Sequence, residues 1–230
     1  MNILITGANR GLGAALVEEA LKRGVARVYA ATRQPYNHPD PRVTNLVLDI
    51  TNEAQVQAAA RQVPALDILI NNAGYAGYDD LTDRAALERH LAVNLFGPFT
   101  VVNAFLPALK RSQHAIVLNV LSTAALAALP IIPSYAISKA AAFSFSQSLR
   151  ARLRGQVKVA IAFPGPIDTE MSATLDAPKA SPQSVAAALL DGLHNGDEEI
   201  FPDASSAPLA TPWRDGALKA MEREFAKFAS

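Results

Sequence analysis

Short runs of consecutive apolar residues alternate with longer amphipathic segments along this chain of 230 residues. The runs have the length and composition of strands buried on both faces, and the longer segments have the 3.6-residue periodicity of helices. The pattern predicts strands at residues 2–6, 27–31, 45–49, 66–70, 115–121 and 156–163, with a short seventh strand at 199–201. It predicts helices at residues 14–23, 53–63, 83–95, 99–110, 135–154, 183–194 and 213–228.

Residues that favour helix ends set several of these limits. Gly24 follows the first helix as a C-terminal cap, and we expect Thr51 and Ser181 to cap the helices that come after them. Gly97 and Pro98 are expected to interrupt the apolar stretch there and divide it into two helices.

Strands that alternate with helices of this length pair in parallel through right-handed crossovers. The predicted fold class is therefore α/β: a single doubly wound (Rossmann) domain over residues 1–230, with a parallel sheet of six to seven strands and helices on both faces. No linker, repeat or low-complexity segment divides the chain.

Composition excludes several kinds of site. Lys plus Arg and Asp plus Glu both total 21, so the formal net charge is zero and neither a nucleic-acid nor a membrane partner is expected. The absence of cysteine excludes disulfides, thiolate zinc sites and cysteine nucleophiles. The four histidines are scattered without metal-ligand spacing, so no metal site is expected.

The chain is expected to be soluble and cytoplasmic. The first strand leads directly into a glycine-rich turn, without the basic and cleavage regions of a secretory signal. Residues 120–137 are apolar enough to be considered as a membrane span, but Pro130 and Pro133 break any spanning helix.

The turn after the first strand has the sequence T-G-A-N-R-G-L-G at residues 6–13. Strand, glycine turn and helix in this order allow the backbone to approach a pyrophosphate, and the helix N-terminus offers that anion free N–H groups. A plain turn between a strand and a helix is the alternative, because glycines are common there.

The end of the second strand lacks the acidic residue that accepts a hydrogen bond from the adenosine ribose in many dinucleotide folds. Thr32 and Arg33 stand there, and Arg10 lies in the glycine turn. Two guanidinium groups and a hydroxyl suit a ribose 2′-phosphate, which favours NADP(H) over NAD(H). The alternative is that both arginines are solvated and either cofactor is used.

Tyr135 and Lys139 are four residues apart on a predicted helix, so their side chains share one face. An ammonium beside a phenol stabilises the phenolate, and we expect it to lower a pKa that is ~10 in water. Such a tyrosine can donate or accept a proton during a reaction. The pair alone occurs often by chance, and its meaning depends on the other motifs.

Together these residues resemble the short-chain dehydrogenase/reductase family, in its short single-domain branch. The resemblance runs from Ile3 to about Met171 without a break in motif order. The motifs are the glycine turn at 6–13, N-N-A-G at 71–74, Asn94, Ser122, the Y-x-x-x-K pair at 135 and 139, and P-G-x-x-x-T at 164–169.

The resemblance implies a cofactor half at about residues 1–120 and a catalytic and substrate half at about 121–230. It implies catalytic roles for Asn94, Ser122, Tyr135 and Lys139. The cofactor-binding residues that it implies are Gly7, Asn9, Arg10, Gly11, Leu12, Gly13, Thr32, Arg33, Asp49, Ile50, Asn72, Ala73, Gly74, Tyr135, Lys139, Pro164, Gly165, Ile167 and Thr169.

The implied reaction interconverts a carbonyl and an alcohol with NADP(H). Ser122 would donate a hydrogen bond to the carbonyl oxygen and Tyr135 would supply the proton. Lys139 would lower the Tyr135 pKa and hold the nicotinamide ribose, and Asn94 would hold a water that connects Lys139 with solvent. Asn71 is expected to brace the strand ends instead of touching the cofactor.

Two other functions stay open. One is a silent dinucleotide-binding regulator or redox sensor. The other is a sugar-nucleotide epimerase or dehydratase, against which the glycine spacing and the short C-terminal part argue.

The helices at 98–110 and 135–154 carry more apolar and small residues than one sheet face covers, and matching helices pair in the family, so a homodimer or homotetramer is expected. The segment of about a dozen residues after Thr169 predicts an open pocket lined by apolar groups such as Leu126, Ile131 and Met171, for hydrophobic carbonyl compounds. Tyr75 and Tyr78 are candidates for the same pocket.

Overall fold

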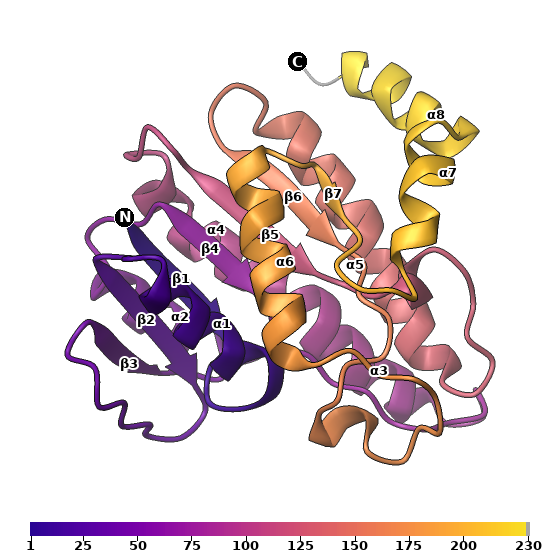
Figure 1. The fold of residues 1–230 in the computed structure, drawn as a ribbon, viewed down its shortest axis with the longest axis horizontal. Coiled ribbons are helices and arrows are strands. Elements are labelled where there is room, and N and C mark those ends of the chain that lie inside the picture. The colour runs from indigo at the N-terminus through magenta and orange to yellow at the C-terminus, as the bar shows by residue number, and fades with distance from the viewer. Residues whose placement is uncertain (229–230) are drawn as a thin grey trace.

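A seven-stranded parallel sheet forms the centre of the computed structural model, which describes residues 1–228. The strand order is β3-β2-β1-β4-β5-β6-β7, which confirms the predicted α/β fold (Figure 1). The strands are β1 (Asn2–Thr6), β2 (Arg27–Thr32), β3 (Val43–Val47), β4 (Ile68–Asn71), β5 (Ile116–Val120), β6 (Lys158–Ala162) and β7 (Glu199–Ile200).

Helices cover both faces of the sheet, and each face has its own apolar core. On one face α1 (Gly11–Lys22) and α6 (Pro182–Asn195) pack against each other and the sheet (Figure 1). The other face is covered by α2 (Glu53–Arg61), α4 (Gly97–Leu109) and α5 (Pro133–Arg152), and Phe105 of α4 is fully buried there. α3 (Arg84–Leu91) leads into α4.

The order of the strands reverses beside β1, because β2 and β4 are its two neighbours. Ligands of open α/β sheets bind in the crevice at such a switch point, beyond the carboxyl ends of the strands. The turns after β1, β4, β5 and β6 all lie at this edge, since the strands are parallel.

The helical stretch from residue 84 to 109 is continuous, so the predicted interruption at Gly97 and Pro98 is wrong. Five π-helical residues (Ala92–Phe96) join α3 to α4. Gly97 and Pro98 directly follow the π-helical residues at the start of α4, and Gly97 passes so close to Ile50 that a Cβ atom there would lie 2.6 Å from the Ile50 side chain. The stretch is long and apolar enough to cross a membrane by length and composition, but here it packs on the sheet.

Two helix ends differ from the prediction. Asn52, not Thr51, caps α2 and accepts a hydrogen bond from the Gln55 N–H at 3.1 Å, while the Thr51 hydroxyl binds the Asp49 carboxylate. The predicted helix over 213–228 is divided into α7 (Ala210–Arg214) and α8 (Ala217–Phe225), followed by a 3-10 turn (Ala226–Phe228). The break lies at Gly216, whose backbone is extended and passes so close to the Pro212 carbonyl that a Cβ atom would lie 2.5 Å from its oxygen.

Candidate active site

The four predicted catalytic residues meet at the carboxyl edge of the sheet. Ser122 follows β5, Asn94 lies in the π-helical segment, and Tyr135 and Lys139 lie in the first half of α5. The Lys139 ammonium nitrogen is 5.6 Å from the centre of the Tyr135 ring. The fold therefore brings together residues that are up to 45 positions apart in the sequence.

The Tyr135 phenol is half-buried and lies close enough to the Ser122 hydroxyl for that group to influence its pKa. Burial raises its pKa above the ordinary value of 10.0, and the nearby Ser122 hydroxyl offsets this only in part. The prediction that the Tyr135 pKa is lowered by Lys139 is wrong, because the net effect of the surrounding protein groups is to raise it. The physical reason is burial, because a phenolate in this position loses more hydration than the neighbouring groups return.

Lys139 is buried, with 5% of its surface exposed. Its ammonium donates a hydrogen bond of 3.0 Å to the carbonyl oxygen of Val120, at the end of β5. Burial lowers the pKa of Lys139 to about 8, since the charged form is poorly solvated there. At neutral pH the side chain is thus a cation held at a fixed point beside the Tyr135 ring.

The Asn94 amide joins three elements of the site. Its Oδ1 accepts from the Tyr75 N–H at 2.9 Å, and its Nδ2 donates to the Tyr75 carbonyl at 2.8 Å and to the Ser138 hydroxyl at 2.9 Å. The side chain therefore fixes the turn after β4 to α5. The proposed water on Asn94 stays a prediction.

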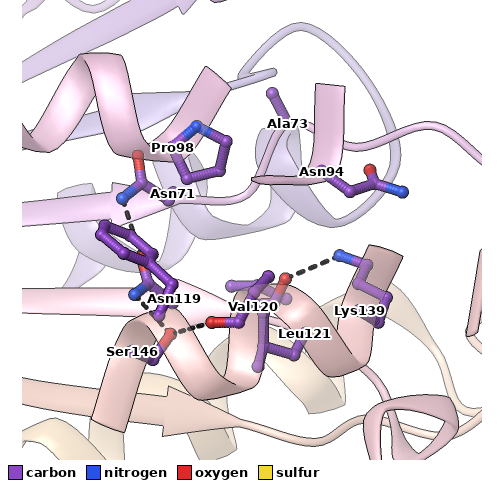
Figure 2. A pocket seen from close by; sticks show the side chains of 11 residues that line it. Asn71, Ala73, Asn94, Pro98, Asn119, Val120, Leu121, Lys139 and Ser146 are labelled. Atoms are coloured by element: carbon purple, nitrogen blue, oxygen red, sulfur yellow. Dashed lines mark hydrogen bonds between the residues drawn. The ribbon is translucent and has the colours of Figure 1, made fainter. Parts of the chain in front are cut away.

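A small cavity lies behind Lys139, with a volume of about 10 Å³ (Figure 2). This is close to the space that one water molecule requires. A chain of buried hydrogen bonds lies along it: Asn71 donates to Asn119 at 2.8 Å, and Asn119 donates to Ser146 at 2.9 Å. Asn71 thus braces the ends of β4 and β5, as predicted.

The glycine turn after β1 has the shape that a pyrophosphate cradle needs. Gly7 and Gly11 have φ values of +67° and +51°, and a Cβ atom on Gly13 would lie 2.0 Å from the Gly7 carbonyl oxygen. Within the described residues no side chain caps the N-terminus of α1, so no side chain competes with an anion for its first N–H groups. This turn fits the phosphates of a dinucleotide.

The N-N-A-G turn after β4 supports the glycine turn. The Thr6 hydroxyl accepts from the N–H groups of Asn72 and Ala73, each at 3.0 Å, and the Asn72 amide donates to the Thr6 carbonyl at 2.9 Å. The P-G-x-x-x-T segment closes the other side, where the Thr169 methyl lies against Gly11. The two segments therefore enclose the turn that would hold the phosphates.

The Thr32 hydroxyl, which is expected to contact a phosphate, has protein partners in this structure. The hydroxyl is buried, donates to the Gln34 carbonyl at 2.7 Å and accepts from the Asn45 amide at 2.7 Å. Both hydrogen bonds of the Thr32 hydroxyl are made within this end of the sheet, because Asn45 lies beside it on the neighbouring strand β3. Arg33 is exposed at the same strand end.

The charged residues near the predicted ribose site have partners of their own. Arg10 forms an exposed ion pair with Glu170, in the segment after the P-G turn. Burial would raise the pKa of Asp49, but hydrogen bonds from Thr51 and the charge of Arg33 hold it below its ordinary value. Arg33 and Asp49 are thus neighbours, whereas Arg10 points toward the far side of the crevice.

Comparison with known proteins gives the family. The family model for short chain dehydrogenase matches residues 1–180. This chain belongs to the short-chain dehydrogenase family. Its members are oxidoreductases, and the order of motifs read from the sequence agrees with the match.

One solved short-chain dehydrogenase, from Burkholderia cenocepacia and in complex with NADP, is 36% identical, covers 97% of this chain and 96% of its own, and superposes with a TM-score of 0.87. The 3-ketodihydrosphingosine reductase of Bacteroides thetaiotaomicron is 29% identical over 73% of this chain and 64% of its own length. Human estradiol 17-beta-dehydrogenase 11 is 28% identical over 91% of this chain and 77% of its own length. The chain spans 58% and 64% of the first two curated relatives that it matches.

Sequence reasoning missed two residues that shape this short-chain dehydrogenase site. His90 is buried between the rings of Tyr75, at 4.7 Å, and Tyr135, at 6.5 Å, and its Nε2 accepts from the Gly77 N–H at 3.0 Å. Asp79 binds the N-terminus of α5. His90 had no metal-ligand spacing and Asp79 lay in a loop, so only their contacts in the fold reveal these roles.

Proposed function

We propose that this protein is an NADP(H)-dependent oxidoreductase that interconverts a ketone or aldehyde and an alcohol, with Tyr135 as general acid and base. The observation that carries the proposal is the Tyr135 phenol, which lies near the Ser122 hydroxyl and beside the buried Lys139 cation. A protein that only senses a dinucleotide has no need for this set of a proton donor and its partners.

In the proposed reduction, the carbonyl oxygen is placed between Ser122 and Tyr135. The Ser122 hydroxyl donates a hydrogen bond to the oxygen as negative charge develops there. Tyr135 donates its proton, which a phenol with an ordinary or raised pKa holds at neutral pH. The bound nicotinamide supplies or accepts the hydride. In the oxidation direction, the Tyr135 phenolate takes the proton of the alcohol.

The choice of NADP(H) rests on Arg10 and Arg33. Both are exposed at the crevice and no carboxylate at the end of β2 opposes a 2′-phosphate. The relative from Burkholderia cenocepacia, at 36% identity, was solved with NADP. NAD(H) stays the alternative if both arginines remain in solvent or in their present ion pairs.

For the substrate we propose a hydrophobic carbonyl compound held in an open pocket. Ile131 and Met171, in the segments before α5 and after β6, are 49% and 53% exposed, and the Tyr78 hydroxyl bonds to Thr174 at 3.1 Å. This bond joins the segment after β4 to the segment after β6. The names of the reductase and the estradiol dehydrogenase relatives denote large apolar compounds, in keeping with this proposal.

We further propose that the protein acts in the cytoplasm as a homodimer or homotetramer, in which chains pair through α4 and α5. Phe96 and Phe99 are 59% and 50% exposed on this face, and Phe99 packs on Phe145 of α5 at 5.7 Å. Large apolar side chains grouped on two adjacent helices favour a protein partner.

NADPH oxidation with a panel of carbonyl compounds tests the proposed function. Aromatic and long-chain ketones should be turned over faster than small charged keto acids. Tight NADPH binding without turnover of any compound would instead support the dinucleotide sensor.

A further inference from the structure

The C-terminal helix α8 turns its charged residues toward the protein. Lys219 is 3% exposed, and its ammonium lies 2.9 Å from Glu198, 2.8 Å from Glu199 and 3.1 Å from Glu222. Arg150 of α5 joins this cluster through bonds of 2.6 Å to both Glu199 and Glu222. The polar side of α8 is therefore the side that attaches it to β7 and α5.

The apolar residues of α8 and its 3-10 turn face solvent. Leu218, Met221, Phe225 and Phe228 are 63%, 49%, 62% and 84% exposed. Figure 1 shows α8 at the periphery of the molecule, beyond the sheet edge. This is the reverse of the usual arrangement of a surface helix, in which the apolar stripe packs on the core.

The four residues are separated by three, four and three positions. This is the spacing of the a and d positions in a heptad, which form the narrow seam between two paired helices. We propose that α8 pairs in antiparallel orientation with α8 of a second copy of this chain. In that arrangement Met221 faces Phe225 of the partner subunit, and Leu218 faces Phe228 of the partner subunit.

The charges around the stripe favour a second copy over a lipid surface. The exposed polar side of α8 carries both signs, with Arg223 and Lys227 beside Glu224. The chain has a formal net charge of zero, so anionic lipids would gain little from contact. A two-fold axis needs a stripe that complements itself, which the four apolar residues do.

The size of the stripe defines its place in the assembly. Four such side chains would bury roughly 400–600 Å² on each chain, whereas a stable interface buries about 800 Å² on each partner. The α8 pair would therefore be too small to hold two chains alone. It would instead join two dimers, each formed through α4 and α5, into a tetramer.

Sedimentation of wild type and variants tests the assembly. We expect a wild-type tetramer at micromolar concentration, and a dimer for Phe225→Glu with unchanged thermal melting and activity. Ala220→Glu, which adds the same charge to α8 outside the stripe, should remain a tetramer. A wild-type dimer, or a tetramer that survives Phe225→Glu, would overturn the pairing but leave the proposed reaction untouched, because neither residue lies at the catalytic edge.

Disulfide cross-linking tests the orientation cleanly, since the chain has no cysteine. Co-expressed Met221→Cys and Phe225→Cys chains should form a mixed disulfide at least tenfold faster than either variant does with itself. Faster self-linking of each variant would indicate parallel helices and contradict the proposal. Flotation with neutral and anionic vesicles that depends on Phe225, with no change in mass in solution, would assign the stripe to a membrane and also overturn it.

Discussion

Asp79 and Ser134 are joined by two hydrogen bonds across 55 positions of the sequence. The Asp79 carboxylate accepts from the Ser134 hydroxyl at 2.8 Å and from its N–H at 3.3 Å. Ser134 is fully buried and directly precedes Tyr135. The loop after β4 thus sets the start of the helix that presents the proposed acid.

Replacing Asp79 by alanine should lower the free energy of unfolding by about 0.5–2 kcal/mol, the usual effect of losing such a cap. It should also lower kcat, because the first turn of α5 positions Tyr135. Asp80→Ala is the matched control, since that carboxylate bonds to Thr82 within its own loop. Chemical denaturation and steady-state kinetics measure the two effects, and equal kcat losses in both variants would contradict the positioning role.

Tyr135→Phe should lower kcat by about two to four orders of magnitude, the usual contribution of a positioned acid. Phe retains the ring, so NADPH affinity should change less than threefold. Ser122→Ala should lower kcat by roughly 10²–10³, with little effect on cofactor affinity. Fluorescence titration with NADPH and initial rates separate the two quantities. A Tyr135→Phe enzyme with most of its rate would refute the mechanism.

The buried Lys139 should make stability depend on pH. Its pKa is lowered from 10.5 to about 8, so between these values the unfolded chain binds more protons than the folded one. The free energy of unfolding should therefore rise with pH across this window, by up to about 3 kcal/mol. Lys139→Met lacks the titrating group. Its melting temperature minus that of wild type should therefore be largest below pH 8 and should decrease as the pH rises toward 10.5. A constant difference would contradict the lowered pKa.

Removing both Arg10 and Arg33 should abolish a preference for NADPH over NADH. Each charged hydrogen bond to a 2′-phosphate contributes about 1.5–3 kcal/mol, so two contribute roughly two to four decades before solvent screening. The comparison is kcat/KM for each cofactor, in wild type and in Arg10→Ala with Arg33→Ala. Lys22→Ala, which removes one exposed cation from α1, shows the effect of losing a positive charge elsewhere on the surface. NADH preference in wild type would refute the assignment.

The sequence predicted the sheet and the motif order well, because both depend on local signals. Buried parallel strands need unbroken apolar runs, and Gly13 is required by a close backbone approach that the spacing of the turn already indicates. The positions of Tyr135 and Lys139 on one helical face followed from the same periodicity.

Other features depend on which residues meet in the fold. The raised pKa of Tyr135 comes from burial, which no spacing reveals. The hydroxyl of Thr32 has a partner on the next strand, Asn45, that no local pattern reveals. The amphipathic pattern of α8 was visible in the sequence, but its direction was decided by Arg150 and its carboxylate partners, far away in the chain.

Because residues Ala92–Phe96 form a π-helical turn, this helix should be disturbed more by inserting or deleting a residue there than by substituting one. A π turn contains one more residue than an α turn needs. Deleting a single residue there would restore regular pitch and rotate Asn94 away from Tyr75, whereas an exposed neighbour such as Phe96 can be exchanged without changing the backbone path. In a library of variants, this segment should tolerate substitutions at its outer positions and reject every insertion and deletion.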